Sequence, residues 1–415
     1  MPNSSESSNF LFDEDETIIP YIKVLHINDC YAHKGLKIST DEKDGKFRHI
    51  LLTGKNGSGK TTILNHLSHV LDYHRNSKLG ITSHGNMLRK RLKDAPEADR
   101  KEIQKSIQDL ENVQVGFSNP EIAGSLYVRR DEYILAYFVA GRRVDLHNVS
   151  TVTTEDEFAS QLASNVDPRR FVASFKQYLV NKKIYEAFDF IAKKRNSESA
   201  KFFTRFTSIL RQILKDPKLE LIFEQESFEF YLHLSDGRRL TFNQLSDGFS
   251  AFLNILMDLL MRSDLIRKKR NDFSYEVPGF VLIDEPETHF HLEMQYEILP
   301  LITAMFPKLQ LIIATHSPAV ISSLENSVVF DLSSNEQVSD WVLGSSYSEL
   351  MMRHFGLDNE FSNTADEILR RINLAASERN LPMLKNILET NSNYLTPSLR
   401  IEIESRIIEL KNKSQ

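Results

Sequence analysis

Two patterns of apolar residues alternate along the chain, and the first consists of short runs with strand character. Residues 279–283 and 309–314 are almost continuously apolar, which is typical of strands buried on both faces of a sheet. The other predicted strands are residues 21–27, 36–38, 49–52, 113–117, 132–139, 219–223 and 228–234, the last followed by an Asp236–Gly237 hairpin turn before residues 239–242. Because helical segments separate these runs, the pattern predicts an α/β fold.

The second pattern is helical. Residues 158–214 carry aromatic side chains at helical spacing, which predicts a helical subdomain whose rings form a core rather than a platform for stacking bases. These aromatic residues are Phe171, Phe175, Tyr178, Tyr185, Phe188 and Phe202. Residues 90–111 are highly charged, and Pro96 divides them into two helical pieces, the second amphipathic through Ile103, Ile107 and Leu110. The predicted parts are an acidic leader at 1–19, an N-terminal part of the main domain at 20–150 with a helical insertion at about 76–112, a basic helical subdomain at 151–218, a C-terminal part of the main domain at 219–344 and a helical tail at 345–415.

Composition places the chain among ordinary globular proteins, since 41% of its residues are hydrophobic and 26% are charged. Its single cysteine, Cys30, excludes a disulfide within the chain and fits a reducing compartment. The sequence has no run of about eighteen apolar residues, and its first ten residues lack a basic region followed by an apolar one. We therefore expect a cytoplasmic protein without a membrane partner.

Charge is distributed unevenly. The formal net charge is −6, yet one stretch of the predicted helical subdomain carries twelve basic residues against three acids, Glu186, Asp189 and Glu198. The basic residues are Arg169, Arg170, Lys176, Lys182, Lys183, Lys193, Lys194, Arg195, Lys201, Arg205, Arg211 and Lys215. Such a stretch indicates either a face that binds DNA phosphates or a partner protein, or an ordinary solvated helical surface.

A phosphate-binding loop follows the apolar run at 49–52. Gly54, Gly59, Lys60 and Thr61 fill the pattern G-x-x-x-x-G-K-[ST] between a predicted strand and a predicted helix. Glycines let backbone N–H groups face the phosphates, Lys60 supplies a positive charge for the β- and γ-phosphates, and the Thr61 hydroxyl is a ligand for Mg²⁺. The residues expected to bind the nucleotide here are Asn56, Gly57, Ser58, Gly59, Lys60, Thr61 and Thr62.

Two other predicted strands end in polar residues that suit the same chemistry. The strand at 279–283 leads into Asp284 and Glu285, of which Asp284 would hold Mg²⁺ and Glu285 would polarise the water that attacks the γ-phosphate. The strand at 309–314 leads into Thr315 and His316, and a histidine at such a strand end can hydrogen-bond the γ-phosphate. After a phosphate-binding loop, these residues predict the catalytic group Lys60, Glu285 and His316.

Two positions admit more than one interpretation from the residues alone. Tyr31, between two predicted strands, can stack on an adenine or simply pack against its neighbours. Ser246 and Gly248 begin an apolar helix, where such residues are either a helix cap or donors to a phosphate held by another subunit.

Taken together, these elements resemble an ABC-class ATPase head, in the branch that includes RecF, SMC proteins and the OLD-family ATPases. GKNGSGKTT is similar to a Walker A motif, LSDGF to the ABC signature, VLIDEPETHFH to a Walker B motif with its D-loop, and ATHSP to an H-loop. The form DEPETHFH followed by ATHSPAVIS resembles the ATPase subunits of bacterial anti-phage systems such as Septu, PARIS and retron-associated modules. The resemblance covers about residues 21–75 and 219–330. It implies a mixed β-sheet around the phosphate-binding loop with an antiparallel β lobe.

The resemblance also implies ATP and Mg²⁺ as cofactors, with two heads enclosing two ATP molecules. Ser246 and Gly248 would then act on the nucleotide of a second copy, and the D-loop residues Glu287, Thr288 and His289 would line the dimer seam. The signature departs from the usual pattern at Asp247 and Phe249. Either Arg142 or Arg143 stands where a Q-loop glutamine is expected.

Several functions remain open at this stage. The first is a dimeric, nucleotide-dependent ATPase switch that controls a separately encoded nuclease or toxin in anti-phage defence. The second is a nucleotide-locked scaffold with slow turnover, and the third is a RecF-like repair ATPase that binds DNA through the basic stretch. A transition-metal site at His289 and His291 lacks a third and fourth ligand at suitable spacing.

Overall fold

The computed structural model describes residues 20–43, 46–77, 81–119, 126–154, 172–193 and 197–338, together with short stretches between 370 and 408. The predicted leader at 1–19 lies outside the described residues, as does Phe171. The chain forms two compact units, Met1–Ser345 and Ser346–Gln415, and each is described by itself.

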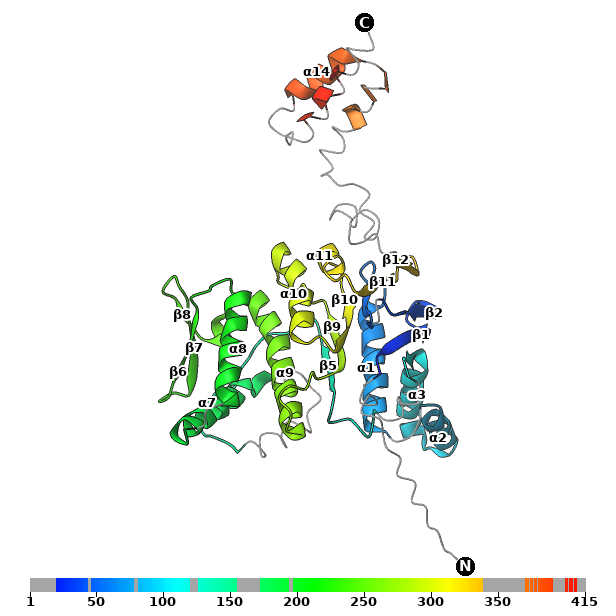
Figure 1. The fold of residues 1–415 in the computed structure, drawn as a ribbon. Helices are drawn as coiled ribbons and strands as arrows, with labels where there is room; N and C mark the ends of the chain where they lie inside the picture. Colours follow the sequence, from blue (N-terminus) through cyan, green and yellow to red (C-terminus); the bar gives the residue numbers. More distant parts are fainter. Residues whose placement is uncertain are drawn as a thin grey trace, which may run out of the picture. The chain divides into compact units, whose positions relative to one another are not determined.

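A six-stranded sheet forms the centre of the first unit, with the strand order β12-β11-β3-β10-β9-β5 (Figure 1). Strands β11, β3, β10, β9 and β5 run parallel to their neighbours, whereas β12 is antiparallel to β11. The bounds are His49–Thr53 for β3, Ile134–Phe138 for β5, Gly279–Asp284 for β9, Leu309–Ala314 for β10, Ser327–Asp331 for β11 and Glu336–Val338 for β12. The predicted α/β class with a mixed sheet is confirmed.

Strands β3, β9 and β10 are buried at every residue, as their apolar sequences predict. Helix α1 (Lys60–Asn76) packs against β9 and β10 on one side, and Figure 1 shows α9 (Asp247–Arg270) and α10 (Leu292–Met305) on the other. The register pairs Leu52 with Ala314 and Ala314 with Asp284. The segments that follow β3, β9 and β10 therefore leave the sheet at one edge, where ligands of parallel sheets bind.

An antiparallel lobe of three strands, β1 (Ile22–Cys30), β2 (His33–Ser39) and β4 (Val113–Phe117), has the order β2-β1-β4. Gln310 of β10 joins this lobe to the central sheet. Its Oε1 accepts from Ile22 N at 2.7 Å, and its Nε2 donates to the carbonyl oxygens of Ile22 at 3.0 Å and Arg48 at 2.9 Å. This arrangement confirms the predicted antiparallel lobe.

The charged insertion forms two helices, α2 (Ile81–Asp94) and α3 (Glu97–Asn112). Pro96 is the N-cap residue of α3, so the predicted division at this proline is confirmed. Ile103 and Leu110 are buried, and Ile107 packs against the same small cluster.

The predicted helical subdomain contains α7 (Phe175–Ile191) and α8 (Glu198–Ile213), followed by the antiparallel strands β6 (Glu220–Glu224), β7 (Glu229–His233) and β8 (Arg239–Leu240). Phe175 and Tyr178 belong to its core as expected. The prediction was wrong for Phe188, which is 58% exposed. Helical periodicity identified the helix, but only the first half of α7 is packed against other parts of the protein, and Phe188 lies in the exposed second half.

The remaining described helices are short. The 3-10 helix η2 (Phe242–Gln244) precedes α9, α11 (Pro318–Ile321) follows β10, and α14 (Leu381–Thr390) belongs to the second unit. In that unit Ile372, Leu384, Ile387 and Ile403 share a small apolar core. Among the residues that the structure describes, none of the helices combines the length and apolar character needed to cross a membrane.

Candidate nucleotide-binding site

Three glycines shape the phosphate-binding loop between β3 and α1. Gly54, Gly57 and Gly59 have φ angles of 136°, 79° and 92°, which L side chains rarely adopt. Asn56 and Gly57 are exposed, whereas Ser58 and Thr62 are partly buried. The loop therefore presents backbone N–H groups beside the N-terminus of α1, an arrangement suited to an anion.

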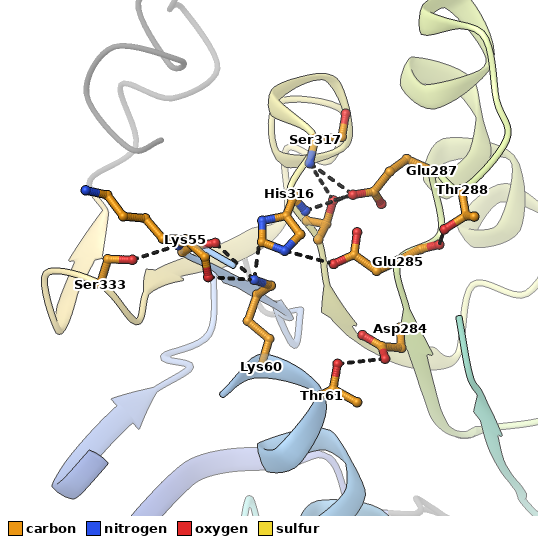
Figure 2. A network of polar contacts seen from close by, with 12 residues as sticks. Lys55, Lys60, Thr61, Asp284, Glu285, Glu287, Thr288, His316, Ser317 and Ser333 are labelled. Atoms are coloured by element: carbon orange, nitrogen blue, oxygen red, sulfur yellow. Dashed lines mark hydrogen bonds and ion pairs between the residues drawn. The ribbon is translucent and has the colours of Figure 1, made fainter. Parts of the chain in front are cut away.

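The Lys60 side chain folds back over this loop (Figure 2). Its Nζ donates to the carbonyl oxygens of Gly54 at 2.9 Å and Lys55 at 3.3 Å, and it lies 3.3 Å from Nδ1 of His316. Lys60 is 5% exposed, and this burial lowers its pKa while the nearby Glu285 and Asp284 raise it. A buried ammonium group is thus held where phosphates would meet the loop.

Residues that the sequence interpretation missed hold the loop from both sides. Nε2 of His33, at the start of β2, lies 2.6 Å from the carbonyl oxygen of Ser58, and Nδ1 lies 3.0 Å from Oδ1 of Asn335. Ser333, after β11, accepts from Lys55 N at 2.7 Å through its hydroxyl. These contacts join segments remote in sequence, so no local pattern could have identified them.

Thr61 and Asp284 meet directly, as the sequence predicted for two ligands of one ion. Thr61 Oγ1 donates to Oδ2 of Asp284 at 2.9 Å. The other carboxylate oxygen, Oδ1, is buried and has no hydrogen-bond partner within the described part of the chain. Burial is the main cause that raises the pKa of Asp284, and Thr61, Arg142 and Lys60 act in the opposite direction. A hydroxyl beside a carboxylate oxygen without a partner is a donor set that fits Mg²⁺.

Glu285 occupies an unusual backbone conformation directly after β9. Its φ is 48°, a region that costs a residue other than glycine about 1–3 kcal/mol. Four hydrogen bonds maintain it: Glu285 N donates to Ala314 O at 2.8 Å, while Glu285 O accepts from Thr288 Oγ1 at 2.9 Å, from Thr288 N at 3.3 Å and from Arg142 at 3.2 Å. The turn directs the carboxyl group toward His316, whose Nε2 lies 3.2 Å from Oε1 of Glu285.

Protonation at this pair follows from its surroundings. Burial and the neighbouring Glu287 raise the pKa of the Glu285 carboxyl to about 9. Burial and the positive charge of Lys60 lower the pKa of His316. Both shifts favour the uncharged forms. Because Lys60 is only a donor, Nδ1 of His316 is the acceptor, and the ring proton on Nε2 faces Glu285.

Arg142 and Arg143 have different surroundings, which the sequence could not distinguish. Arg142 is 4% exposed and donates to the carbonyl oxygens of Val139 at 3.0 Å, Asp284 at 2.9 Å and Glu285 at 3.2 Å. Burial lowers its pKa to about 10. Arg143 is exposed and forms an ion pair with Asp247 at 3.0 Å. Arg142 thus supports the backbone of the two acids, and Arg143 connects the same segment to the start of α9.

Two residues at the start of α9, Ser246 and Gly248, were predicted to contact a nucleotide, and packing within the chain accounts for one of them. Ser246 is the N-cap residue, yet its side chain makes no capping hydrogen bond. Gly248 is buried and packs so closely against the segment after β9 that a Cβ there would lie 2.6 Å from His289 O. Close packing therefore requires glycine at 248, whereas the exposed Ser246 is not needed as a side-chain cap.

Tyr31 lies over the phosphate-binding loop. It is 64% exposed with a φ of 59°, and a Cβ on Gly59 would meet its ring at 3.0 Å. The structure thus places the predicted adenine-stacking residue beside the loop, with part of its ring exposed.

Five of the eight basic residues of the predicted basic face that the structure describes form ion pairs within the chain. Lys176 and Lys182 are buried and form ion pairs with Glu229 at 2.5 Å and Asp264 at 2.7 Å. Other ion pairs join Lys183 to Glu186, Lys201 to Glu198 and Lys215 to Glu293. Arg169, Arg170, Lys194 and Arg195 lie outside the described residues. The described part of this stretch does not favour the DNA-binding interpretation.

The site and the sheet around it define a class of protein. Residues 50–322 match the AAA_21 family, an AAA domain whose description also names the AbiEii toxin and type IV toxin–antitoxin (TA) systems. Since this match spans most of the chain, the protein belongs to that family.

Particular relatives extend the comparison. The chain is similar to the Septu protein PtuA of Bacillus thuringiensis, with 22% identity over 328 residues, which cover 77% of this chain and 78% of PtuA. The Retron Ec83 probable ATPase of Escherichia coli is 27% identical over 188 residues, covering 40% of this chain and 32% of that protein. Among solved structures, an Smc head bound to the C-winged helix domain of ScpA matches 75% of this chain and 94% of that one, with 14% identity and a TM-score of 0.40.

Proposed function

We propose that this protein binds ATP with Mg²⁺ and hydrolyses it to ADP and phosphate. The observation that carries the proposal is the meeting of Lys60, Thr61, Asp284, Glu285 and His316 at one sheet edge, each within hydrogen-bonding distance of another. These residues supply an ammonium group, two ligands for a cation, a carboxyl group and an imidazole, which is the set that phosphoryl transfer uses.

Thr61 and Asp284 are the residues that would hold Mg²⁺. When bound, the cation neutralises charge on the β- and γ-phosphate oxygens. Lys60 would exchange the carbonyl oxygens of Gly54 and Lys55 for phosphate oxygens, gaining charge-assisted hydrogen bonds. The raised pKa of the neighbouring Glu285 would fall beside a cation held by Thr61 and Asp284, which favours the ionised form of Glu285. Ionised Glu285 would orient the attacking water and accept its proton, and His316, which already contacts both Lys60 and Glu285, would donate to the γ-phosphate.

At the level of the whole molecule, we propose a dimeric ATPase switch that controls a separate effector in anti-phage defence. The support is the similarity to a Septu protein and to a retron ATPase. In such a dimer, Ser246 at the start of α9 would act on the nucleotide of the second copy, in agreement with its exposed side chain.

Nucleotide binding and hydrolysis are tested with Lys60→Ala. Removing the ammonium group should weaken binding of Mg·ATP at least tenfold, because a charge-assisted contact to phosphate contributes about 1.5–3 kcal/mol. Calorimetric titration and phosphate release measure the two steps, with Lys23→Ala in β1 as a surface control. Parental binding and turnover in Lys60→Ala would refute the assignment.

The effector is tested by native mass spectrometry of the protein purified with the products of its genomic neighbours, with and without ATP. We expect a second protein to co-purify stably and its retention to differ between the samples with and without ATP. A chain that binds no partner but binds duplex DNA with strong salt dependence would instead favour a repair ATPase.

A further inference from the structure

Glu287 follows the site acids by only two residues, yet its carboxylate is directed to another strand end. Its Oε1 accepts three hydrogen bonds, from Thr315 Oγ1 at 2.7 Å, His316 N at 2.8 Å and Ser317 N at 3.0 Å (Figure 2). A single oxygen thus holds three consecutive residues of the segment that follows β10.

The local geometry makes this arrangement specific. Thr315 is fully buried and Ser317 is 6% exposed, so water cannot readily replace the carboxylate as their acceptor. The other oxygen, Oε2, is buried and has no hydrogen-bond partner in the described part of the chain. The Glu287 carboxylate therefore bonds the backbone that carries His316 through one oxygen, and it also lies close enough to Glu285 to raise the pKa of that carboxyl.

The position of the His316 ring depends on that backbone. The ring contacts two residues of the proposed reaction centre, with Nδ1 3.3 Å from Lys60 Nζ and Nε2 3.2 Å from Glu285 Oε1. Glu287 O also accepts from Phe290 N at 2.9 Å, and Gln295 links Phe290 O at 3.0 Å to Ser317 Oγ at 2.6 Å. The turn after β9 and the segment after β10 thus form one connected unit around the imidazole.

We infer that Glu287 is a positioning residue that fixes the backbone at Thr315–Ser317 and so holds the His316 imidazole between Lys60 and Glu285. The effect of Glu287 on catalysis rests on the proposed ATPase function, whereas its effect on the backbone at Thr315–Ser317 does not. It differs from the expectation that Glu287 faces a dimer seam, because its carboxylate bonds within its own chain. Glu287 itself makes no proposed contact with the nucleotide.

The structural part is tested first, without nucleotide. Backbone amide hydrogen exchange is measured for peptides covering residues 314–320 in Glu287→Ala, Glu287→Gln and the exposed-surface control Glu325→Ala. We expect exchange at least tenfold faster in Glu287→Ala, and near-parental exchange in Glu287→Gln, because glutamine keeps an acceptor oxygen. Parental exchange in Glu287→Ala would overturn the inference whether or not the protein hydrolyses ATP.

The catalytic part uses a double-mutant cycle with His316→Ala. Glu287→Ala alone should lower kcat by about 10- to 100-fold, as expected when a reacting group is displaced by roughly 1 Å, with the Kd of ATP within about threefold of the parent. In the His316→Ala background the same substitution should change kcat less than about threefold when each kcat is taken from its pH-independent plateau, because the effect of Glu287 on the pKa of Glu285 no longer contributes there and the remaining effect passes through the imidazole. Full additivity, or an equal loss in Glu287→Gln, would overturn the positioning role.

The two proposals fail in distinguishable ways. A parental protein that neither binds nor hydrolyses ATP removes the proposed function, while the exchange measurement still decides whether Glu287 holds the segment. If Glu287→Ala does not fold, the variant Thr315→Val is used in its place in both measurements, because it removes one of the three donors to the Glu287 carboxylate. Faster exchange at residues 314–320 in Thr315→Val is then expected, and parental exchange counts against the inference.

Discussion

At the scale of single residues, Gly248 shows that packing within one chain can explain a residue whose motif suggests contact with a second chain. The sequence interpretation assigned it to the nucleotide of a second copy. In the structure, a Cβ at this position would lie 2.6 Å from His289 O and 3.3 Å from the Phe290 ring. His289 has a φ of 68°, so its backbone is already in an uncommon conformation. The close approach of α9 to this turn therefore requires a residue without a side chain.

We predict that Gly248→Ala lowers the free energy of unfolding by about 1–3 kcal/mol, the usual effect of inserting an atom into packed structure. Gly85→Ala is the matched control, because Gly85 lies within α2 and a Cβ there would meet nothing within 4 Å. That control should be neutral or stabilising by up to about 1 kcal/mol. Urea unfolding measures both variants, and equal midpoints would contradict the packing argument.

At the scale of elements, a buried ion pair joins the helical subdomain to the long helix of the main domain. Lys182 of α7 and Asp264 of α9 are 2.7 Å apart, and their side chains are only 7% and 17% exposed. The Lys182 ammonium also lies 5.3 Å from the centroids of the Tyr178 and Phe202 rings. A lysine that sequence alone assigned to a possible DNA-binding face is thus part of the contact between two helices.

We predict that Asp264→Ala destabilises the protein by about 3–5 kcal/mol, because it leaves the Lys182 charge buried without its carboxylate. Glu198→Ala is the control: it breaks the Lys201 pair, whose side chains are 57% and 38% exposed, and should cost less than about 1 kcal/mol. Combining Lys182→Met with Asp264→Leu should recover most of the loss. Thermal unfolding compares the variants, and similar losses in Asp264→Ala and Glu198→Ala would refute this account.

At the scale of the whole molecule, the parallel sheet determines which residues meet. β3, β10 and β9 are adjacent, and the phosphate-binding loop, His316 and Asp284 follow their C-terminal ends. Ser333 connects the β11–β12 turn to the same region, whereas Gln310 connects the β1–β2 lobe to the N-terminal end of β10. Under the proposed function, one chain therefore supplies residues for the phosphates, the cation and the attacking water, and Ser246 comes from a second chain.

We predict that Glu285→Gln retains ATP binding, slows hydrolysis by about 10²- to 10⁴-fold and accumulates as an ATP-bound dimer. Glutamine keeps the size of the side chain but cannot accept the proton of the attacking water. Native mass spectrometry with Mg·ATP gives the stoichiometry, phosphate release gives the rate, and Lys60→Ala provides the nucleotide-free control. Hydrolysis at the parental rate would show that Glu285 is not the base, and a monomer that retains ATP would contradict the dimer.

The sequence by itself determined the parts whose signals are local. Continuous apolar runs identified β9 and β10, the glycine pattern identified the phosphate-binding loop, and Pro96 marked the start of α3. The candidate site residues Lys60, Thr61 and Asp284 were found in the same way, because each stands at a fixed offset from the end of a strand or the start of a helix. Neighbouring residues are enough to specify such features.

Only the tertiary structure shows which side chains outside the motifs contact the phosphate-binding loop and the site acids. His33, Ser333 and Arg142 contact the loop and the acids from segments far away in sequence, and no periodicity relates them. The tertiary structure also shows that Phe188 is exposed while Phe175 is buried, and that Lys182 forms a buried ion pair instead of contributing to a basic surface. Burial and partners depend on what packs opposite a residue, and that information is not carried by the residue's own segment of the chain.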